Sequence, residues 1–159
     1  MKNILVFCCL LSTGIIAGLF FSWSVSVMPG LKKLGDREFI SSMQSMNRAI
    51  LNPLFFTFFF GALILLFISC FSLYQKSLRL DYYLLLGSTL LYLIGVMGIT
   101  IVGSIPLNNL IESFDLTNAS DEAMDEIRSS FEEKWTLLNN LRTGSSIAAF
   151  CLLIIRLIR

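Results

Sequence analysis

Four uncharged stretches, separated by short charged segments, dominate this chain. They cover residues 3–31, 49–75, 82–111 and 143–155. A helix needs about 20 mainly apolar residues to cross the hydrocarbon core of a bilayer. The first three stretches meet this requirement, and the fourth meets it only if its helix begins further upstream. We therefore expect four membrane-spanning helices.

Composition supports the same fold class. Hydrophobic residues make up 55% of the chain and charged residues 14%, well below the roughly one quarter of soluble domains. The first stretch is too long for the apolar region of a cleavable signal peptide, so we expect it to be retained. We predict one integral membrane domain over residues 1–159, an all-α transmembrane four-helix bundle with amphipathic connecting helices. The expected spans are residues 4–28, 53–73, 82–103 and 135–155.

Several functional classes are disfavoured by what the chain lacks. It has no histidine, and its four cysteines are scattered through apolar runs without a Cys-x-x-Cys pair. A histidine-ligated metal or haem and a thiol exchange motif are thus disfavoured, and we expect no metal and no cofactor. The net charge is +1 without a basic run, so we expect no nucleic-acid partner.

The connections carry clear local signals. Pro29-Gly30 is expected to end the first helix, and apolar residues recur at helical spacing between residues 36 and 51, which predicts an amphipathic connecting helix. Asn52-Pro53 is typical of a helix start, with asparagine as the cap and proline in the first position. Small residues at helical spacing predict close packing of helices in lipid: Gly14, Gly18, Ser22, Gly95 and Gly98.

An acidic segment precedes the fourth apolar run. Eight carboxylates lie between residues 112 and 133. A solvated face of a helix that begins near Ser120 explains them better than a metal site. Within that helix Met124, Phe131 and Trp135 form one apolar stripe, and the stripe continues to Arg142.

Arg142 is the strongest functional candidate. The fourth apolar run is about 20 Å long as a helix, so the span must begin near Trp135, and Arg142 then lies inside the bilayer or at its edge. An ionisable side chain there costs at least about 2.5 kcal/mol and normally faces the bundle interior. The alternative is an arginine that extends to the lipid headgroups.

Polar residues of several segments should meet at one end of the bundle. In a four-span chain the first and third connections lie on the same side, so we expect a polar mouth above an apolar cavity. The phenylalanines of residues 55–60 are most simply lipid and core contacts, with a ligand-binding aromatic wall as the alternative. The residues expected at the mouth are Gln44, Asn47, Asn52, Asn108, Asn109, Asn139 and Arg142.

The same residues carry a family resemblance. The motifs are Trp23 to Leu31 (WSVSVMPGL), Met43-Gln44 with Asn47, Asn52-Pro53-Leu54-Phe55, Pro106-Leu107-Asn108, and Trp135 with Asn139 and Arg142-Thr143. Together they resemble the anthrone-oxygenase-like family of small four-span membrane proteins, much of which is a domain of unknown function. Where relatives commonly have Trp-Asn followed by histidine, this chain has Leu138-Asn139-Asn140.

The resemblance implies an oxidoreductase, since characterised fungal members oxidise anthrones to anthraquinones with molecular oxygen and no evident cofactor. The first hypothesis is therefore a cofactor-independent oxygenase of a lipophilic phenolic or anthrone-like substrate. Its expected catalytic residues are Arg142, Asn139 and Asn108, which would stabilise an oxyanion. The expected substrate-binding residues are Trp23, Gln44, Asn47, Asn52 and Trp135.

The second hypothesis is a non-catalytic membrane module that binds a lipid or quinone or assists another membrane protein. The lack of an obvious general base favours it, because only Glu112 or Asp115 folded back toward Arg142 would supply one. Under either hypothesis the partners are a lipophilic small molecule or lipid and the membrane itself, and the small-residue faces are compatible with a homo-oligomer.

Charge distribution predicts an orientation in the plasma (inner) membrane. The amino end, the turn with Lys76 and Arg79, and the tail with Arg156 and Arg159 carry five basic residues and one acid, and the opposite loops carry seven and ten. Short segments influence orientation more than long loops. We therefore expect both termini to be cytoplasmic.

Overall fold

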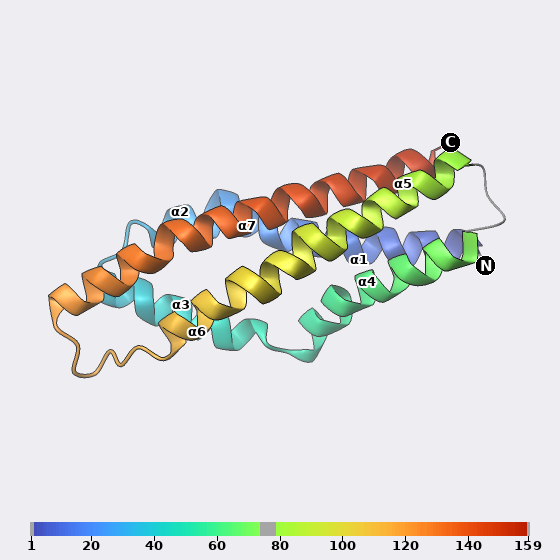
Figure 1. The fold of residues 1–159 in the computed structure, drawn as a ribbon. Coiled ribbons are helices and arrows are strands. Elements are labelled where there is room, and N and C mark those ends of the chain that lie inside the picture. The colour runs from blue at the N-terminus through green and yellow to red at the C-terminus, as the bar shows by residue number, and fades with distance from the viewer. Residues whose placement is uncertain (1, 74–78, 159) are drawn as a thin grey trace.

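The computed structural model describes residues 2–73 and 79–158, and this part of the chain is helical without a strand. Four long helices form an elongated bundle (Figure 1). The first comprises α1 (Lys2–Ser22), the π-helical segment η1 (Trp23–Val27) and α2 (Met28–Leu31), and the second is α4 (Pro53–Leu73). The third comprises α5 (Arg79–Leu90), η2 (Leu91–Gly98), η3 (Thr100–Ser104) and α6 (Ile105–Glu112). The fourth is α7 (Asp121–Leu157).

Each of the four helices is long and apolar enough to cross a membrane. The predicted all-α four-helix membrane bundle is confirmed. The amphipathic connecting helix is α3 (Asp36–Ile50), which buries Phe39, Ile40 and Met43. Both termini lie at one end of the bundle, and α2, α3, α6 and the start of α7 lie at the other (Figure 1). Lys76 of the predicted polar turn and Arg159 of the tail lie outside the described residues.

Two prolines lie within the long helices. We predicted that Pro29-Gly30 would end the first helix, but the helix continues to Leu31, and the third helix likewise passes through Pro106 to Glu112. In an α-helix proline removes one hydrogen bond and clashes with the carbonyl four residues earlier. Here a π-helical segment ends two residues before each proline. Its wider turn is closed by bonds over five residues, from the Met28 amide to the Trp23 carbonyl and from the Ile105 amide to the Thr100 carbonyl.

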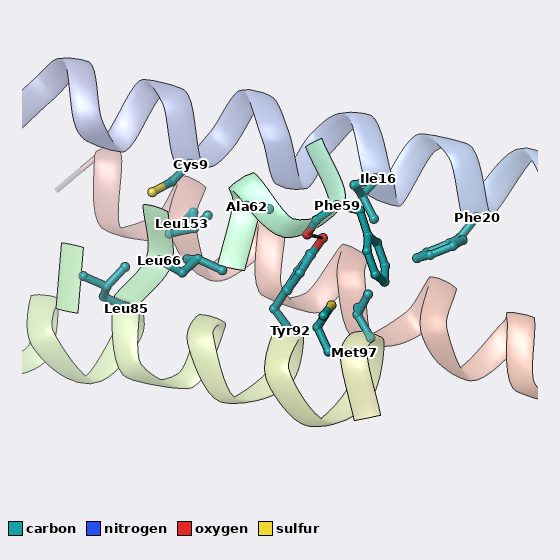
Figure 2. Packing of buried hydrophobic residues seen from close by; sticks show 11 residues of the cluster. Cys9, Ile16, Phe20, Phe59, Ala62, Leu66, Leu85, Tyr92, Met97 and Leu153 are labelled. Atoms are coloured by element: carbon teal, nitrogen blue, oxygen red, sulfur yellow. Dashed lines mark hydrogen bonds between the residues drawn. The ribbon is translucent and has the colours of Figure 1, made fainter. Parts of the chain in front are cut away.

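The core of the bundle draws on all four helices. Figure 2 shows Ile16 of α1, Phe59 and Leu66 of α4, Tyr92 of η2 and Leu153 of α7 packed together. The Tyr92 hydroxyl donates to the Phe59 carbonyl at 2.9 Å. That bond satisfies a polar group that would be costly if left unpaired among apolar side chains.

A second core lies at the end formed by α2, α3, α6 and the first half of α7. Arg128 of α7 donates to the carbonyls of Lys32 and Leu34, forms an ion pair with Asp36, and lies 4.5 Å from the centre of the Phe39 ring. These contacts hold the segment between α2 and α3 against α7.

Both predicted helix starts are confirmed. The Asn52 side chain accepts a bond from the Phe55 amide at 3.0 Å, and Ser120 accepts one from the Ala123 amide at 3.3 Å. These caps satisfy amides that have no partner within the first turn.

The small-residue predictions hold only in part. A Cβ atom added at Gly95 would lie 2.2 Å from Ser145 Oγ, so η2 and α7 do touch there, and one at Gly14 would lie 3.0 Å from Phe150. The prediction is wrong for Gly98 and Gly18. A Cβ atom added at Gly98 would meet only the Leu93 carbonyl of its own helix, at 3.6 Å, and one added at Gly18 would meet no atom within 4 Å. Gly18 lies on the outward side of α1, because α1 packs through Cys9, Ile16 and Phe20.

Candidate functional site: an aromatic-lined cavity beside a buried arginine

A cavity of about 200 Å³ lies in the half of the bundle that contains the connecting helix. We call it the interior cavity. All four long helices and α3 contribute to it, and each π-helical segment supplies at least one lining residue. π-helical turns inside α-helices are frequent at functional sites. The polar or tryptophan residues that line it are Trp23, Asn47, Thr100, Ser104, Asn108, Trp135, Asn139 and Arg142.

One side of the interior cavity is an aromatic wall formed by Phe55, Phe56, Phe59 and Phe60 of α4. Phe55 stacks on Phe59 with ring centres 5.0 Å apart, and Phe56 stacks on Phe60 at 5.9 Å. The sequence left lipid contacts and a ligand wall as alternatives for these side chains, and the structure places these four on the cavity. Across it, the rings of Trp23 and Trp135 lie 4.9 Å apart.

Arg142 faces the bundle interior, as predicted, with 7% of its surface exposed. Its guanidinium lies 4.6 Å from the centre of the Phe20 ring and 5.8 Å from that of Trp135. Nη1 donates to Thr100 Oγ1 at 3.3 Å and Nη2 to Asn139 Oδ1 at 3.5 Å, both long bonds. This burial excludes the alternative of an arginine that extends to the headgroups.

Within the described residues no carboxylate pairs with Arg142. The suggested partners are engaged elsewhere: Glu112 pairs with Arg48 at 2.6 Å, and Asp115 accepts a bond from the Thr117 amide at 2.8 Å. That amide also lowers the pKa of the exposed Asp115 carboxyl. The guanidinium is therefore a buried cation held by aromatic faces and neutral oxygens alone.

Asn139 fixes the position of Arg142 from the preceding turn of α7. Its Nδ2 donates to the Phe20 carbonyl at 3.1 Å and to Ser24 Oγ at 2.9 Å. Its Oδ1 is then oriented toward the guanidinium. Trp135 is held in a similar way, since its Nε1 donates to Asn108 Oδ1 at 2.8 Å. Trp135 is thus positioned by a side chain of the third helix, and Arg142 by a residue of its own helix that is itself bonded to the first helix.

Three buried polar atoms at the interior cavity have no hydrogen-bond partner among the described residues. They are Arg142 Nε, Asn47 Nδ2 and Ser104 Oγ, contributed by α7, α3 and η3. An unpaired buried donor costs about 1–3 kcal/mol. Three elements around one hollow therefore each contribute a side chain with an unsatisfied polar atom.

The family model of anthrone oxygenases matches residues 54–152. This chain belongs to the anthrone oxygenase family. The match includes Thr100, Asn108, Trp135, Asn139 and Arg142, and it ends short of Trp23 and Asn47 on the amino-terminal side. Neither the curated proteins nor the solved structures gave a match.

In this anthrone oxygenase family member, most of the expected site residues meet at the cavity. Trp23, Asn47, Asn108, Trp135, Asn139 and Arg142 line it. Gln44 does not; its Nε2 donates to the carbonyls of Ile111 and Phe114 and joins α3 to α6. Asn52 does not either, since its side chain caps α4 and donates to the Ala49 carbonyl.

Sequence reasoning overlooked Thr100 and Ser104. They lie one turn apart on the third helix, and both line the interior cavity. Their spacing of four residues within an apolar run was the available signal. Small hydroxyl residues are also common in ordinary contacts between membrane helices, so only their position opposite Arg142 distinguishes them.

A second hollow of about 280 Å³, the outer vestibule, shares Asn47, Leu51, Ile105 and Asn108 with the interior cavity. Its rim carries the exposed ion pair of Arg48 and Glu112. The predicted polar mouth therefore has a counterpart in the structure, and Asn109 lies at this vestibule rather than at the interior cavity.

Proposed function

We propose that this membrane protein is a cofactor-independent oxygenase of a lipophilic phenolic or anthrone-like substrate. The observation that carries the proposal is Arg142, a buried guanidinium that faces an aromatic-lined cavity and has no carboxylate partner in the part of the chain that the structure describes. The positive charge of this site favours binding of an anionic ligand over a neutral one. Membership of the anthrone oxygenase family supports the type of reaction.

The chemistry begins with loss of a proton from the substrate, which gives a phenolate or enolate. Its oxygen binds at the guanidinium, and its electron-rich carbon transfers an electron pair to dioxygen as the carbon–oxygen bond forms. The peroxide takes up the released proton and then loses water, which leaves a new carbonyl group. One dioxygen is consumed and one water is formed for each quinone. Preorganised donors in a site without bulk water are effective at stabilising such anions.

The lining residues of the interior cavity offer no conventional base. Within the described chain the lining includes no carboxylate, imidazole or thiol. The substrate must therefore be acidic enough to ionise once its oxygen is next to a cation, and a nearby opposite charge favours the charged form of an acid. Arg142 thus promotes ionisation as well as binding, with Asn139 and Asn108 as positioning residues.

The alternative is a non-catalytic module that binds a lipid or quinone or assists a partner membrane protein. The missing base favours it, and the outward position of Gly18 leaves a small-residue surface open to a partner or a second copy. Under both proposals residues 1–159 form one domain in the plasma (inner) membrane with both termini in the cytoplasm.

Oxygen uptake by the purified protein tests the proposal. With anthrone or an alkyl phenol, we expect oxygen consumption matched by quinone formation. Arg142→Met should abolish both, whereas Arg37→Met, at an exposed arginine outside the cavity, should leave them unchanged. Absence of uptake with ligands that demonstrably bind would contradict the oxygenase and favour the non-catalytic module.

A further inference from the structure

We propose that the ligand of the interior cavity is a tailed lipid whose head is a single phenol or quinone ring. The head lies at Arg142, and the apolar tail leaves the protein sideways into the bilayer. This inference rests on the proposed function only in taking the interior cavity as the ligand site. It predicts that the site prefers ligands with a single ring to the fused tricyclic anthrones.

The volume of the interior cavity limits the size of the head. A cavity of about 150 Å³ holds one benzene molecule, and sites for drug-sized ligands are typically about 300–1,000 Å³. The interior cavity, at about 200 Å³, accommodates one ring with small substituents. A fused tricyclic ring system exceeds this space, so most of such a molecule would remain outside the walls.

The cavity opens toward lipid along one side. Phe56 and Phe60 of α4, with Ile101 of η3, line it and are also exposed on the surface of the bundle. The elements on which α4 packs most extensively are α1 and α5, and its contacts with η3 are few. All three exposed side chains belong to helices apolar enough to span a membrane, and they present no polar group to a passing acyl or prenyl chain.

Polar groups form a separate part of the cavity lining. Arg142 and Asn139 of α7 meet Thr100 of η3 there, and the unpaired Arg142 Nε and Ser104 Oγ belong to the same two helices. A further unpaired donor, Asn47 Nδ2, comes from α3. A ring with two oxygens can accept bonds from both groups of donors. A plain acyl chain in the cavity would leave every one of them unpaired, at about 1–3 kcal/mol each.

Tryptophan fluorescence offers a direct test, because Trp23 and Trp135 are the chain's two tryptophans and both line the cavity. The protein is placed in lipid nanodiscs and titrated with three probes: a benzoquinone with a decyl tail, the same benzoquinone without a tail, and anthrone. We expect the tailed benzoquinone to quench at the lowest mole fraction in the bilayer. Tighter binding of anthrone than of the tailed benzoquinone would overturn the inference.

Matched variants distinguish binding through a lateral opening from simple partition of the tailed probe into the lipid. Ile101 and Val102 are adjacent, with 58% and 80% of their surfaces exposed, and only Ile101 lines the cavity. Ile101→Phe should narrow the opening and weaken binding of the tailed probe about tenfold, or about 1.4 kcal/mol. Val102→Phe should leave binding unchanged. Equal effects of the two substitutions would contradict an exit at this side.

Oxygen uptake with the matching decyl phenol distinguishes the two proposals. Quenching by the tailed benzoquinone without any oxygen consumption would leave the tailed ligand supported and the oxygenase contradicted. Oxygen consumption with anthrone, together with no preference for the tailed probe, would support the oxygenase and contradict the tailed ligand. The binding measurement needs no turnover, so neither outcome depends on the other.

Discussion

At the scale of single residues, the bundle buries a cation with few strong polar partners. Arg142 makes two long hydrogen bonds, leaves Nε unpaired and has no carboxylate partner among the described residues. Asn139 beside it is tied to a backbone carbonyl and a hydroxyl of the first helix. Under the proposed function Arg142 serves a ligand, whereas Asn139 joins the fourth helix to the first.

These roles predict opposite effects on stability. Arg142→Met removes a poorly paired buried charge, so we expect thermal stability in detergent at or above that of the wild type, with loss of ligand binding. Asn139→Leu leaves the Phe20 carbonyl and Ser24 without this donor and should cost about 1–3 kcal/mol. Thermal unfolding of both variants and the wild type provides the measurement. A large loss of stability in Arg142→Met would instead make the arginine structural.

At the scale of elements, the site depends on helices that depart from regular α geometry. The π-helical segments carry the first and third helices through Pro29 and Pro106, and they place Trp23, Thr100 and Ser104 on the interior cavity. The close approach of η2 to α7 at Gly95 then sets how near the third helix lies to the helix of Arg142.

Two glycines of the third helix form a matched test of this approach. A methyl group at Gly95 would lie 2.4 Å from Ser145 Cβ, which cannot move away without its backbone, so Gly95→Ala should cost about 1–3 kcal/mol. Gly98→Ala meets only a carbonyl at 3.6 Å and should be neutral or gain up to about 1 kcal/mol from helix propensity. Chemical unfolding in mixed micelles compares the two. Equal tolerance would show that η2 and α7 are not tightly packed at Gly95.

At the scale of the whole molecule, the bundle is asymmetric along its axis. The fourth helix has 37 residues, about 55 Å at 1.5 Å per residue, and exceeds the roughly 30 Å hydrocarbon core. Its acidic first turns therefore extend beyond the hydrocarbon core at the end away from the termini, the end where α3 and α6 also lie. The interior cavity lies toward that end and the outer vestibule opens there.

Orientation is open to a labelling experiment. In a cysteine-free background, a cysteine at position 122 should react with a membrane-impermeant maleimide added to intact cells, and a cysteine at position 76 should react only after the cells are broken. The basis is the excess of basic over acidic residues in the short segments. External labelling at position 76 would reverse the assignment.

The sequence determined the features that depend on local pattern. Long apolar runs required four membrane-spanning helices, because backbone polar groups in lipid must be satisfied within the segment. Cap residues set the starts of α4 and α7, and helical periodicity placed Trp135 and Arg142 on one inward face. These outcomes need only neighbours within a few turns.

The tertiary structure alone decided the features that depend on contacts between distant segments. Thr100 lies 42 residues before Arg142, and nothing in either run indicates that the two meet. Whether Phe59 faces lipid or a cavity depends on the helices beside α4, and whether Gly98 or Gly95 touches α7 depends on a rotation that π turns alter. The cavity is the space left between several packed helices. No single segment of the sequence therefore predicts it.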